Sequence, residues 1–169
     1  LRDPEFLFEK ESYKKCGSIF WPDQGMIRSD HEILDICNIE QKTLRELESG
    51  QMLIDKSKCW AALQLTMFVN EHSDFFYQFV YGDKDTYLLA WKMLNQPFVM
   101  TKHGVQVIRD EYEHRLAFFQ HDFDGNIIFQ HRNGAKLGAD ILCPIVPGFV
   151  YEDKCEEFLN QIKDIEVPG

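Results

Sequence analysis

Strand-like and helix-like segments alternate along this chain, and no other feature limits its possible folds as strongly. Apolar residues recur at helical spacing between residues 58 and 72, through Trp60, Leu63 and Met67. Further helices are predicted near residues 4–13, 29–37, 73–80, 83–94 and 153–165, and strands near 16–22, 51–55, 98–101 and 105–108. Strands separated by helices predict an α/β fold with a mixed, mainly parallel sheet and flanking helices.

Residues 115–131, RLAFFQHDFDGNIIFQH, give the clearest local signal in the chain. Two strand-like runs flank Asp124-Gly125, and an Asp-Gly pair between such runs strongly predicts a β-hairpin. We expect this hairpin at one edge of the sheet, in a single domain over residues 1–169, because this length suits one domain. In α/β folds, polar ligands bind at the carboxyl ends of strands, and the polar motifs of this chain fall there.

The charge of the chain argues against nucleic acid as a partner. The formal net charge is −10, and no basic patch is visible in the sequence. A polyanionic backbone is therefore a poor ligand. A small molecule that carries phosphate remains compatible, because one lysine or one metal ion can offset the local field.

The cysteines do not form a recognisable metal or disulfide pattern. There are five of them, Cys16, Cys37, Cys59, Cys143 and Cys155, and no CxxC pair occurs. A zinc site or a disulfide framework would need closer and more regular spacing. We expect most of these cysteines to be buried as small hydrophobic side chains.

The start of the chain reads like the middle of a domain. It opens at Leu1 without a methionine, and Asp3-Pro4 follows at once. No apolar run approaches the length of a membrane span, and no signal-peptide pattern is present. We expect a fragment of a longer protein, whose membrane anchor, if there is one, lies upstream.

The segment ESGQMLIDK, residues 48–56, is a candidate substrate-binding motif. The Ser49-Gly50 turn before a buried strand brings backbone amides close to anything bound above it. Gln51 offers both a donor and an acceptor, and Glu48 adds a carboxylate. The alternative is a simple turn at the entry to a strand.

The segment GDKDT, residues 82–86, has more charge than a helix cap requires. One carboxylate is enough for a cap, so either Asp83 or Asp85 is surplus. Carboxylates bind sugar hydroxyls well and stabilise a developing oxocarbenium ion. Lys84 can hold a phosphate or a neighbouring carboxylate. The alternative is a capped helix with a solvated lysine.

The segment HRNGAK, residues 131–136, combines groups suited to a diphosphate. His131 ends a strand, and a neutral imidazole is a common metal ligand. Gly134 would let the backbone pass close to a diphosphate, and Lys136 would neutralise a leaving group. The alternative is a surface loop after the hairpin.

The segment FWPDQG, residues 20–25, offers a possible platform for a sugar ring. Trp21 would stack on the face of a pyranose, and Asp23 would bind its hydroxyls. A core tryptophan followed by a turn explains the segment nearly as well.

Read in order, DPEFLF, FWPD, ESGQMLIDK and YGDKDTYLLAW resemble the fungal α-mannosyltransferase family of Golgi glycan synthesis. Members of that family are type II membrane proteins that use GDP-mannose. The likeness spans roughly residues 3–94 and fades beyond residue 100. The ordered set of four motifs makes the resemblance fairly specific.

Beyond residue 100 the chain looks more like the wider class of retaining nucleotide-sugar transferases with the GT-A fold, such as glycogenin. These carry a turn like Ser49-Gly50 before a strand, and an Asp-Gln pair where this chain has Asp83-Lys84. They end in a histidine–glycine–lysine motif, matched by His131, Gly134 and Lys136. The lysine lies one residue closer to the glycine than in that class, and the Pro-Trp that usually follows is absent.

The resemblance also implies a divalent metal, Mn²⁺ or Mg²⁺, on the diphosphate of the donor. In the family, an Asp-x-Asp motif that holds the metal stands just before the segment matching LRDPEFLF. This chain begins at Leu1, too late to contain that motif. By resemblance, His131 is the third metal ligand.

The resemblance implies a metal-dependent glycosyltransferase that moves a hexose, most simply mannose, with retention. The donor is a nucleotide-diphospho-sugar, and the acceptor is a glycan or glycoprotein. The chain would form the C-terminal part of a GT-A domain, the half that holds the acceptor and the donor sugar. Asp83 would face the donor sugar, Asp85 would cap the helix or bind hydroxyls, and Lys136 would draw charge from the departing diphosphate.

Two other functions remain open at this point. One is a transferase that uses UDP-glucose or UDP-galactose, and the other is a non-catalytic carbohydrate-binding module. The Golgi lumen fits the fungal family, while the cytoplasm fits a bacterial or viral enzyme. The transferase interpretation depends on one spatial expectation, that Asp83–Asp85 and His131 converge on a single pocket.

Overall fold

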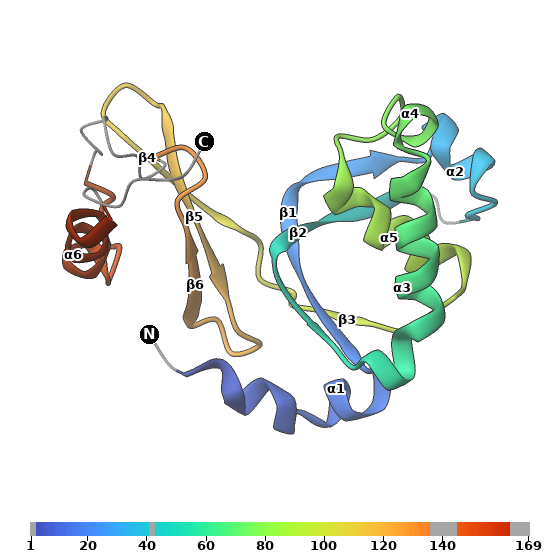
Figure 1. The fold of residues 1–169 in the computed structure, drawn as a ribbon, viewed down its shortest axis with the longest axis horizontal. Coiled ribbons are helices and arrows are strands. Elements are labelled where there is room, and N and C mark those ends of the chain that lie inside the picture. Colours follow the sequence, from blue (N-terminus) through green and yellow to red (C-terminus); the bar gives the residue numbers. More distant parts are fainter. Residues whose placement is uncertain (1–2, 41–42, 136–144, 163–169) are drawn as a thin grey trace. The chain divides into compact units, whose positions relative to one another are not determined.

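The computed structural model describes residues 3–40, 43–135 and 145–162, which divide into two compact units. The N-terminal unit is Asp3–Gly104, and the C-terminal unit starts at Val105. Each has its own sheet (Figure 1), and the expectation of one domain over residues 1–169 stays a prediction. In chain order the elements are η1 (Pro4–Glu9), α1 (Glu11–Cys16), β1 (Ser18–Arg28), α2 (Glu32–Ile36), β2 (Thr43–Ile54), α3 (Lys56–Glu71), α4 (Ser73–Phe76), α5 (Asp83–Met93), β3 (Val99–Met100), β4 (Gln106–Arg109), β5 (Arg115–His121), β6 (Ile127–His131) and α6 (Glu152–Ile162).

The sheet of the N-terminal unit has the order β2-β1-β3, and most of its pairing is antiparallel. Long strands β1 and β2 run antiparallel, while β1 and β3 pair in parallel over only two residues each. The α/β character is therefore confirmed, but the expectation of a mainly parallel sheet is wrong. The helix between β1 and β2, Glu32–Ile36, has only five residues, or about 7.5 Å at the helical rise per residue, so it is too short to carry the chain back along the eleven-residue strand β1.

Two bulges interrupt the β1–β2 ladder. Opposite the step from Phe20 to Trp21, β2 carries three residues without a counterpart, 49–51, which we call the β2 bulge. Opposite Glu46, β1 carries residues 23–25, which we call the β1 bulge. Bulges bend a strand and redirect its side chains, and they are frequent beside active sites.

The predicted strand at residues 51–55 is the end of the longer strand β2. Ser49-Gly50 lies inside that strand, as part of the β2 bulge, so the expected separate turn is wrong. Pro22 stands between the two bulges, in a ladder already irregular on both sides. A proline has no N–H to donate, and bulges are among the few places in a sheet that accept it.

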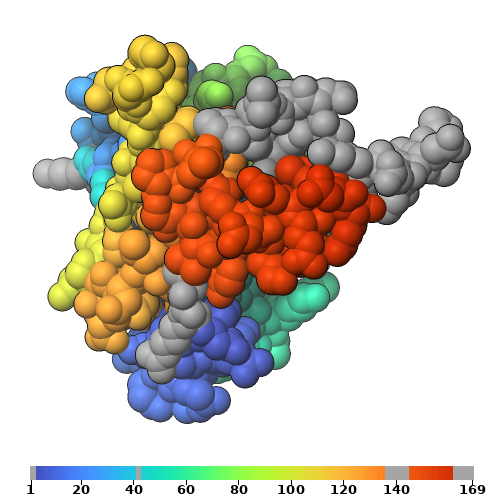
Figure 2. Space-filling view, turned by 90° about the vertical axis from the view of Figure 1, so that its left-hand side faces the viewer, coloured from blue at the N-terminus to red at the C-terminus, as the bar shows by residue number. Residues whose placement is uncertain are grey.

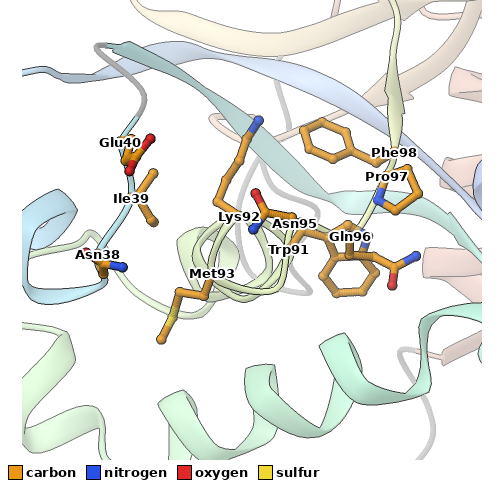
Figure 3. Close-up of a pocket in the computed structure, with 10 residues that line it drawn as sticks. All are labelled: Asn38, Ile39, Glu40, Trp91, Lys92, Met93, Asn95, Gln96, Pro97 and Phe98. Atoms are coloured by element: carbon orange, nitrogen blue, oxygen red, sulfur yellow. The ribbon is translucent and has the colours of Figure 1, made fainter.

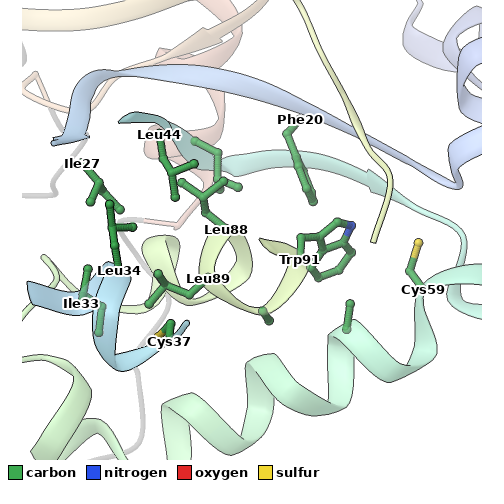
Figure 4. Close-up of a cluster of buried hydrophobic side chains, with 13 residues drawn as sticks. Phe20, Ile27, Ile33, Leu34, Cys37, Leu44, Cys59, Leu88, Leu89 and Trp91 are labelled. Carbon is green, nitrogen blue, oxygen red and sulfur yellow. The ribbon is translucent and has the colours of Figure 1, made fainter. Parts of the chain in front are cut away.

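Helix α5 is the centre of the N-terminal unit, with the sheet on one side of it and α3 on the other (Figures 1 and 4). Trp91 is fully buried, and its indole N–H donates to Ser18 Oγ at 3.1 Å. The Phe20 ring meets it edge-on at 5.3 Å between centroids. The buried members of this cluster are Phe20, Ile27, Ile33, Leu34, Cys37, Leu44, Leu47, Cys59, Ala62, Leu88, Leu89, Ala90 and Trp91.

Helix α3 turns a different face to α5 from the one that its apolar spacing predicts. Trp60 is 58% exposed and Met67 is 56% exposed, so two of the apolar residues whose spacing predicts this helix lie outside its buried face. The buried residues of α3 are small, namely Cys59, Ala62, Thr66 and Val69. Small side chains allow two helix backbones to approach closely, and that close contact replaces the larger stripe.

The Phe-rich segment 74–80 only partly joins the core. Phe76, Phe79 and Val80 pack against the buried cluster, whereas Phe75 and Tyr77 are exposed. The aromatic side chains of this segment therefore divide between the core and the surface.

The cysteines agree in part with the expectation of burial. Cys37 and Cys59 are buried, while Cys16 and Cys155 are half-buried. Burial raises the pKa of the Cys37 thiol to about 11, so this thiol stays protonated at neutral pH. Cys143 lies outside the described residues.

The C-terminal unit is built on an antiparallel sheet of order β4-β5-β6. Its β5–β6 hairpin confirms the hairpin predicted from Asp124-Gly125, but the expectation that it lies at an edge of the main sheet is wrong, because it belongs to this second sheet. The Asp122 carboxylate accepts the backbone N–H groups of Asp124 and Asn126 at 2.9 Å each, and Gly125 takes a φ of 91°. Glycine reaches this left-handed region without the steric cost that other residues meet.

The C-terminal helix α6 is tied to the rest of its unit through Glu152 at its first turn. Glu152 forms an ion pair with Arg132 and accepts the Val146 N–H at 2.7 Å. Figure 2 shows α6 in red at the surface, and Phe158 on this helix is 59% exposed. Across the described ranges, no helix is both long enough and apolar enough to cross a bilayer.

Candidate functional site

Four charged side chains from three elements meet at the N-terminal end of α5, and we call them the Lys84 cluster. Lys84 Nζ lies 2.6 Å from Asp23 Oδ2 and 2.6 Å from Glu46 Oε2. It lies 3.8 Å from Asp85 Oδ1. Asp23 comes from the β1 bulge, Glu46 from β2 opposite that bulge, and Asp85 from α5 itself. The structure therefore brings together three predicted residues, Asp23, Lys84 and Asp85.

The β1 bulge also makes room for Glu46. A Cβ placed on Gly25 would lie 2.4 Å from the Glu46 carboxylate, closer than atoms can approach. Any larger residue at position 25 would push this carboxylate out of its present place beside Lys84. The β1 bulge thus supplies Asp23, one of the two carboxylates that bind the ammonium, and makes room for Glu46, the second.

The Lys84 ammonium is held charged by its neighbours. Its side chain is only 18% exposed, and burial alone would lower its pKa. Hydrogen bonds to Asp23 and Glu46 outweigh the burial and hold the pKa of Lys84 well above the ordinary lysine value. With three carboxylates around one ammonium, the ionised cluster carries an excess of negative charge.

Asp85 is the most deeply buried member of the cluster. It is 2% exposed, and its Oδ2 accepts the Tyr81 N–H at 3.0 Å. Within the described part of the chain, its Oδ1 has no hydrogen-bond partner, although Lys84 stands 3.8 Å away. Burial raises the pKa of Asp85, and the nearby Lys84 only partly offsets this. Its ionised form is therefore held at some cost in stability.

Replacing Asp85 with asparagine tests that cost through its pH dependence. A folded-state pKa above the unfolded value means that the folded protein binds the proton more tightly. Asp85 therefore favours folding more as the pH falls from neutral through the raised pKa towards its ordinary value. We expect the stability of the wild type, relative to Asp85→Asn, to rise on acidification in urea unfolding at several pH values. A difference that stays constant or shrinks would contradict this.

Asp83 is placed differently from its two neighbours. It is exposed at the first position of α5, and across residues 3–40, 43–135 and 145–162 its carboxylate has no hydrogen bond or ion pair. The N-cap position is Gly82, without a side-chain cap, so the expectation that Asp83 or Asp85 caps this helix is wrong. Asp85 instead reaches back to the N–H of Tyr81. Asp83 is thus left available to a ligand.

The β2 bulge carries the other predicted binding residues, Glu48 to Gln51. Glu48 is buried, and its Oε1 accepts the Gly50 N–H at 3.0 Å, which holds the bulge in shape. Ser49 is half-buried. Gln51 Nε2 is buried and has no hydrogen-bond partner among the described residues, so one amide donor remains for a ligand or water.

Trp21 does not form the sugar platform that its sequence context suggests. Its side chain is fully buried, so no ring face is open for a pyranose to stack on. It pairs with Glu48 across the ladder, next to the β2 bulge. This correction removes Trp21 from the candidate binding residues and leaves Asp23, which belongs to the Lys84 cluster.

The predicted histidine–glycine–lysine motif belongs to the C-terminal unit. His131 is the last residue of β6. The Gly134 N–H donates to the Leu116 carbonyl at 3.1 Å, and a Cβ on Gly134 would lie 1.7 Å from the Arg115 carbonyl oxygen. The glycine is thus required by close packing against β5. Lys136 lies outside the described residues, and the expected meeting of His131 with Asp83–Asp85 stays a prediction.

The implied divalent metal does not fit the described side chains. Among residues 3–40, 43–135 and 145–162, no three His, Cys, Asp or Glu side chains are arranged so that they could hold a metal ion. The carboxylates of the Lys84 cluster surround an ammonium, and that ammonium uses the oxygens a metal ion would need. His131 remains a single predicted ligand.

Sequence reasoning missed Glu46, which binds Lys84 as closely as Asp23 does. Glu46 lies between the buried residues Leu44 and Leu47, which are three positions apart, so strict alternation along β2 does not predict the face on which Glu46 lies. The β1 bulge changes the register at this point, and nothing in the sequence near Glu46 signals it. The only sequence signal for such a residue was Lys84 itself, because a lysine at the start of an amphipathic helix needs carboxylate partners if its ammonium is not fully in solvent.

Comparison with known proteins gives a consistent set of similarities. The family model described as "Mannosyltransferase putative" matches residues 38–131. Alpha-1,2-mannosyltransferase MNN2 of Saccharomyces cerevisiae is 25% identical over 164 residues, which covers 69% of this chain and 28% of that protein. Alpha-1,2-mannosyltransferase MNN5 of the same organism is 31% identical over 106 residues, covering 56% of this chain and 18% of that protein. The chain thus spans less than a third of the length of these relatives.

Proposed function

This chain belongs to the mannosyltransferase family whose model covers more than half of it, and from that membership we propose that it serves mannosyl transfer from a nucleotide-sugar donor to a glycan acceptor. The similar yeast proteins are both named alpha-1,2-mannosyltransferases. The matched region includes Glu46, Lys84 and Asp85, and thus most of the Lys84 cluster.

The observation that carries the proposal is the exposed carboxylate of Asp83 beside a fixed, buried charge cluster. An ionised carboxylate is a strong acceptor for sugar hydroxyls, and it stabilises positive charge that develops at an anomeric carbon. We assign this role to Asp83, because it is exposed and unpaired among the described residues. Asp85 is a positioning residue, since it holds the Tyr81 N–H in the turn before α5.

Lys84 also acts as a positioning residue in this proposal. Its ammonium contacts two carboxylates at 2.6 Å, and its raised pKa keeps it protonated. A protonated amine has no free electron pair, so it does not attack the anomeric carbon of the donor. Its role is to fix Asp23 and Glu46, and with them the start of α5.

Further parts of the proposal rest on the resemblance of the sequence motifs. They are GDP-mannose as the donor, retention at the anomeric carbon, the GT-A fold and the Golgi lumen as the compartment. The described residues do not form a site for Mn²⁺, so no step is assigned to a metal.

Replacing Asp83 with asparagine in the complete protein tests the proposed function. We expect mannosyl transfer to fall about 100-fold, because the neutral amide cannot offer the same charge to the reacting sugar. The thermal stability should not change, since the side chain is exposed and unpaired within the described region. Asp74→Asn is the matched control, an exposed aspartate in the first turn of α4. Near-normal transfer by Asp83→Asn would remove Asp83 from the mechanism.

A further inference from the structure

A cavity of about 760 Å³ opens in the N-terminal unit, away from the start of α5 (Figure 3). Its wall comes from three segments, namely residues 38–40 after α2, residues 91–93 at the end of α5, and residues 95–98 that follow α5. Its size falls within the range of small-molecule sites. None of these residues belongs to the Lys84 cluster.

The two helices that end at this cavity end in the same way. After α2, the Ile39 N–H donates to the Leu34 carbonyl at 2.8 Å, and after α5 the Gln96 N–H donates to the Trp91 carbonyl at 2.8 Å. Both are Schellman motifs, which need a left-handed residue just past the helix. That residue is an asparagine in each case, with a φ of 50° at position 38 and 51° at position 95.

Backbone geometry restricts both positions to glycine or asparagine, the two residues that most readily adopt the left-handed conformation. Glycine is the usual residue there, because it has no Cβ to clash in the left-handed conformation. Asn38 and Asn95 both line the cavity. Within the described residues, neither side-chain amide forms a hydrogen bond. Both side chains are exposed, so among the described residues their amides are open to solvent and available to a ligand in the cavity.

The charge of the cavity wall is balanced. Its charged side chains among the described residues are Lys92 and Glu40, and neither forms an ion pair there. Lys92 Nζ instead lies 4.8 Å from the centre of the Phe98 ring. The carbonyl ends of two helices add partial negative charge, which disfavours an anion. A neutral ligand rich in hydroxyls suits this mixture of donors and acceptors.

We propose that this cavity is a second carbohydrate site, which binds a mannose residue of the glycan acceptor through Asn38, Asn95 and Lys92. The identity of the sugar rests on the proposed function, whereas the preference for a neutral polyol rests on the cavity itself. Lys92 lies eight residues after Lys84 on α5, or about 12 Å at the helical rise per residue. One glycan chain of several residues can reach both places.

The double substitution Asn38→Gly with Asn95→Gly tests the proposal without disturbing the helix ends. Glycine keeps both Schellman motifs, so the unfolding midpoint should stay the same or rise. Binding is measured by NMR titration of the backbone amides with methyl α-mannoside and with an α-1,2-linked mannobiose. We expect shifts at residues 38–40 and 92–98 in the wild type, and affinity at least about tenfold weaker in the double variant. Mannose 6-phosphate serves as the charged control and should bind more weakly than methyl α-mannoside, because the carbonyl ends of the two helices disfavour an anion.

Two results would overturn the second site. One is the absence of shifts at these amides in the wild type at sugar concentrations well above about 1 mM. The other is equal binding by the double variant. Both are separate from the test of Asp83. If Asp83→Asn abolishes transfer while the cavity binds no mannoside, the proposed function stands and only the second site fails. If the cavity binds mannoside while Asp83→Asn transfers normally, the second site stands and only the role of Asp83 in the proposed mechanism fails. If the complete wild-type protein transfers no mannose, the proposed function itself fails, whatever the cavity binds.

Discussion

Replacing Lys84 with methionine is expected to lower the free energy of unfolding by about 3 kcal/mol, because it leaves the carboxylates of the cluster without a counter-ion. Asp23 and Glu46 would face each other across a half-buried site, with Asp85 beside them. Methionine keeps most of the apolar stem of lysine, so the loss would come mainly from charge. Urea unfolding of the wild type and the variant at neutral pH measures it.

The pH dependence of this loss follows from the raised pKa of Lys84. A raised lysine pKa means that its stabilisation is complete below the ordinary value of 10.5 and is lost as the pH rises through the raised value. The difference between wild type and variant should therefore be the same at about pH 7 and pH 9. Lys154→Met is the control, since that lysine pairs with Glu157 on an exposed helix face and should matter little. A Lys84→Met protein as stable as this control would contradict the assigned role.

Replacing Gly134 with alanine is expected to destabilise the C-terminal unit by about 3 kcal/mol, the upper end of the usual cost of overpacking. The new Cβ would stand 1.7 Å from the Arg115 carbonyl oxygen, a backbone atom that cannot rotate away. The loop would have to withdraw from β5 and give up the hydrogen bonds from Gly134 and Ala135 to the Leu116 carbonyl. Thermal unfolding and hydrogen exchange of the β5 amides would both report this.

Gly104→Ala is the matched control for this change. Its nearest side-chain atom, Arg45 Nη2, would lie 3.4 Å from the new Cβ, at the edge of ordinary contact. This variant should keep nearly the full stability of the wild type. If Gly134→Ala were as stable as Gly104→Ala, this result would contradict the close packing of the loop after β6 against β5.

Local sequence signals predicted the elements of this protein better than their arrangement. The Asp124-Gly125 hairpin and the helix through residues 58–72 were confirmed, because turn chemistry and periodicity are properties of short segments. The pairing direction of β1 and β2 was predicted wrongly, since it depends on a connection whose helix proved too short to cross the sheet. The apolar spacing also does not identify the buried face of α3, because that face consists of the small side chains Cys59, Ala62, Thr66 and Val69.

For the candidate site too, the sequence predicted local features better than their arrangement in space. Asp83, Lys84 and Asp85 were recognised from the surplus of charge in one short segment. Their separate roles became visible only with burial, which leaves Asp83 exposed and buries Asp85. Glu46 is distant from Lys84 in sequence, and it reaches the ammonium only because a bulge shifts the register of the ladder. No pattern confined to a short window contains that information.

The bulges of the β1–β2 ladder also bear on how the molecule avoids self-association. Strand β2 has twelve residues and forms one edge of its sheet in the described structure, so its outer backbone groups could template a strand from another molecule. Bulges increase local twist and bend an edge, which spoils the straight alignment that intermolecular pairing needs. The irregularities that gather three carboxylates around one ammonium therefore also make this edge a poor seed for aggregation.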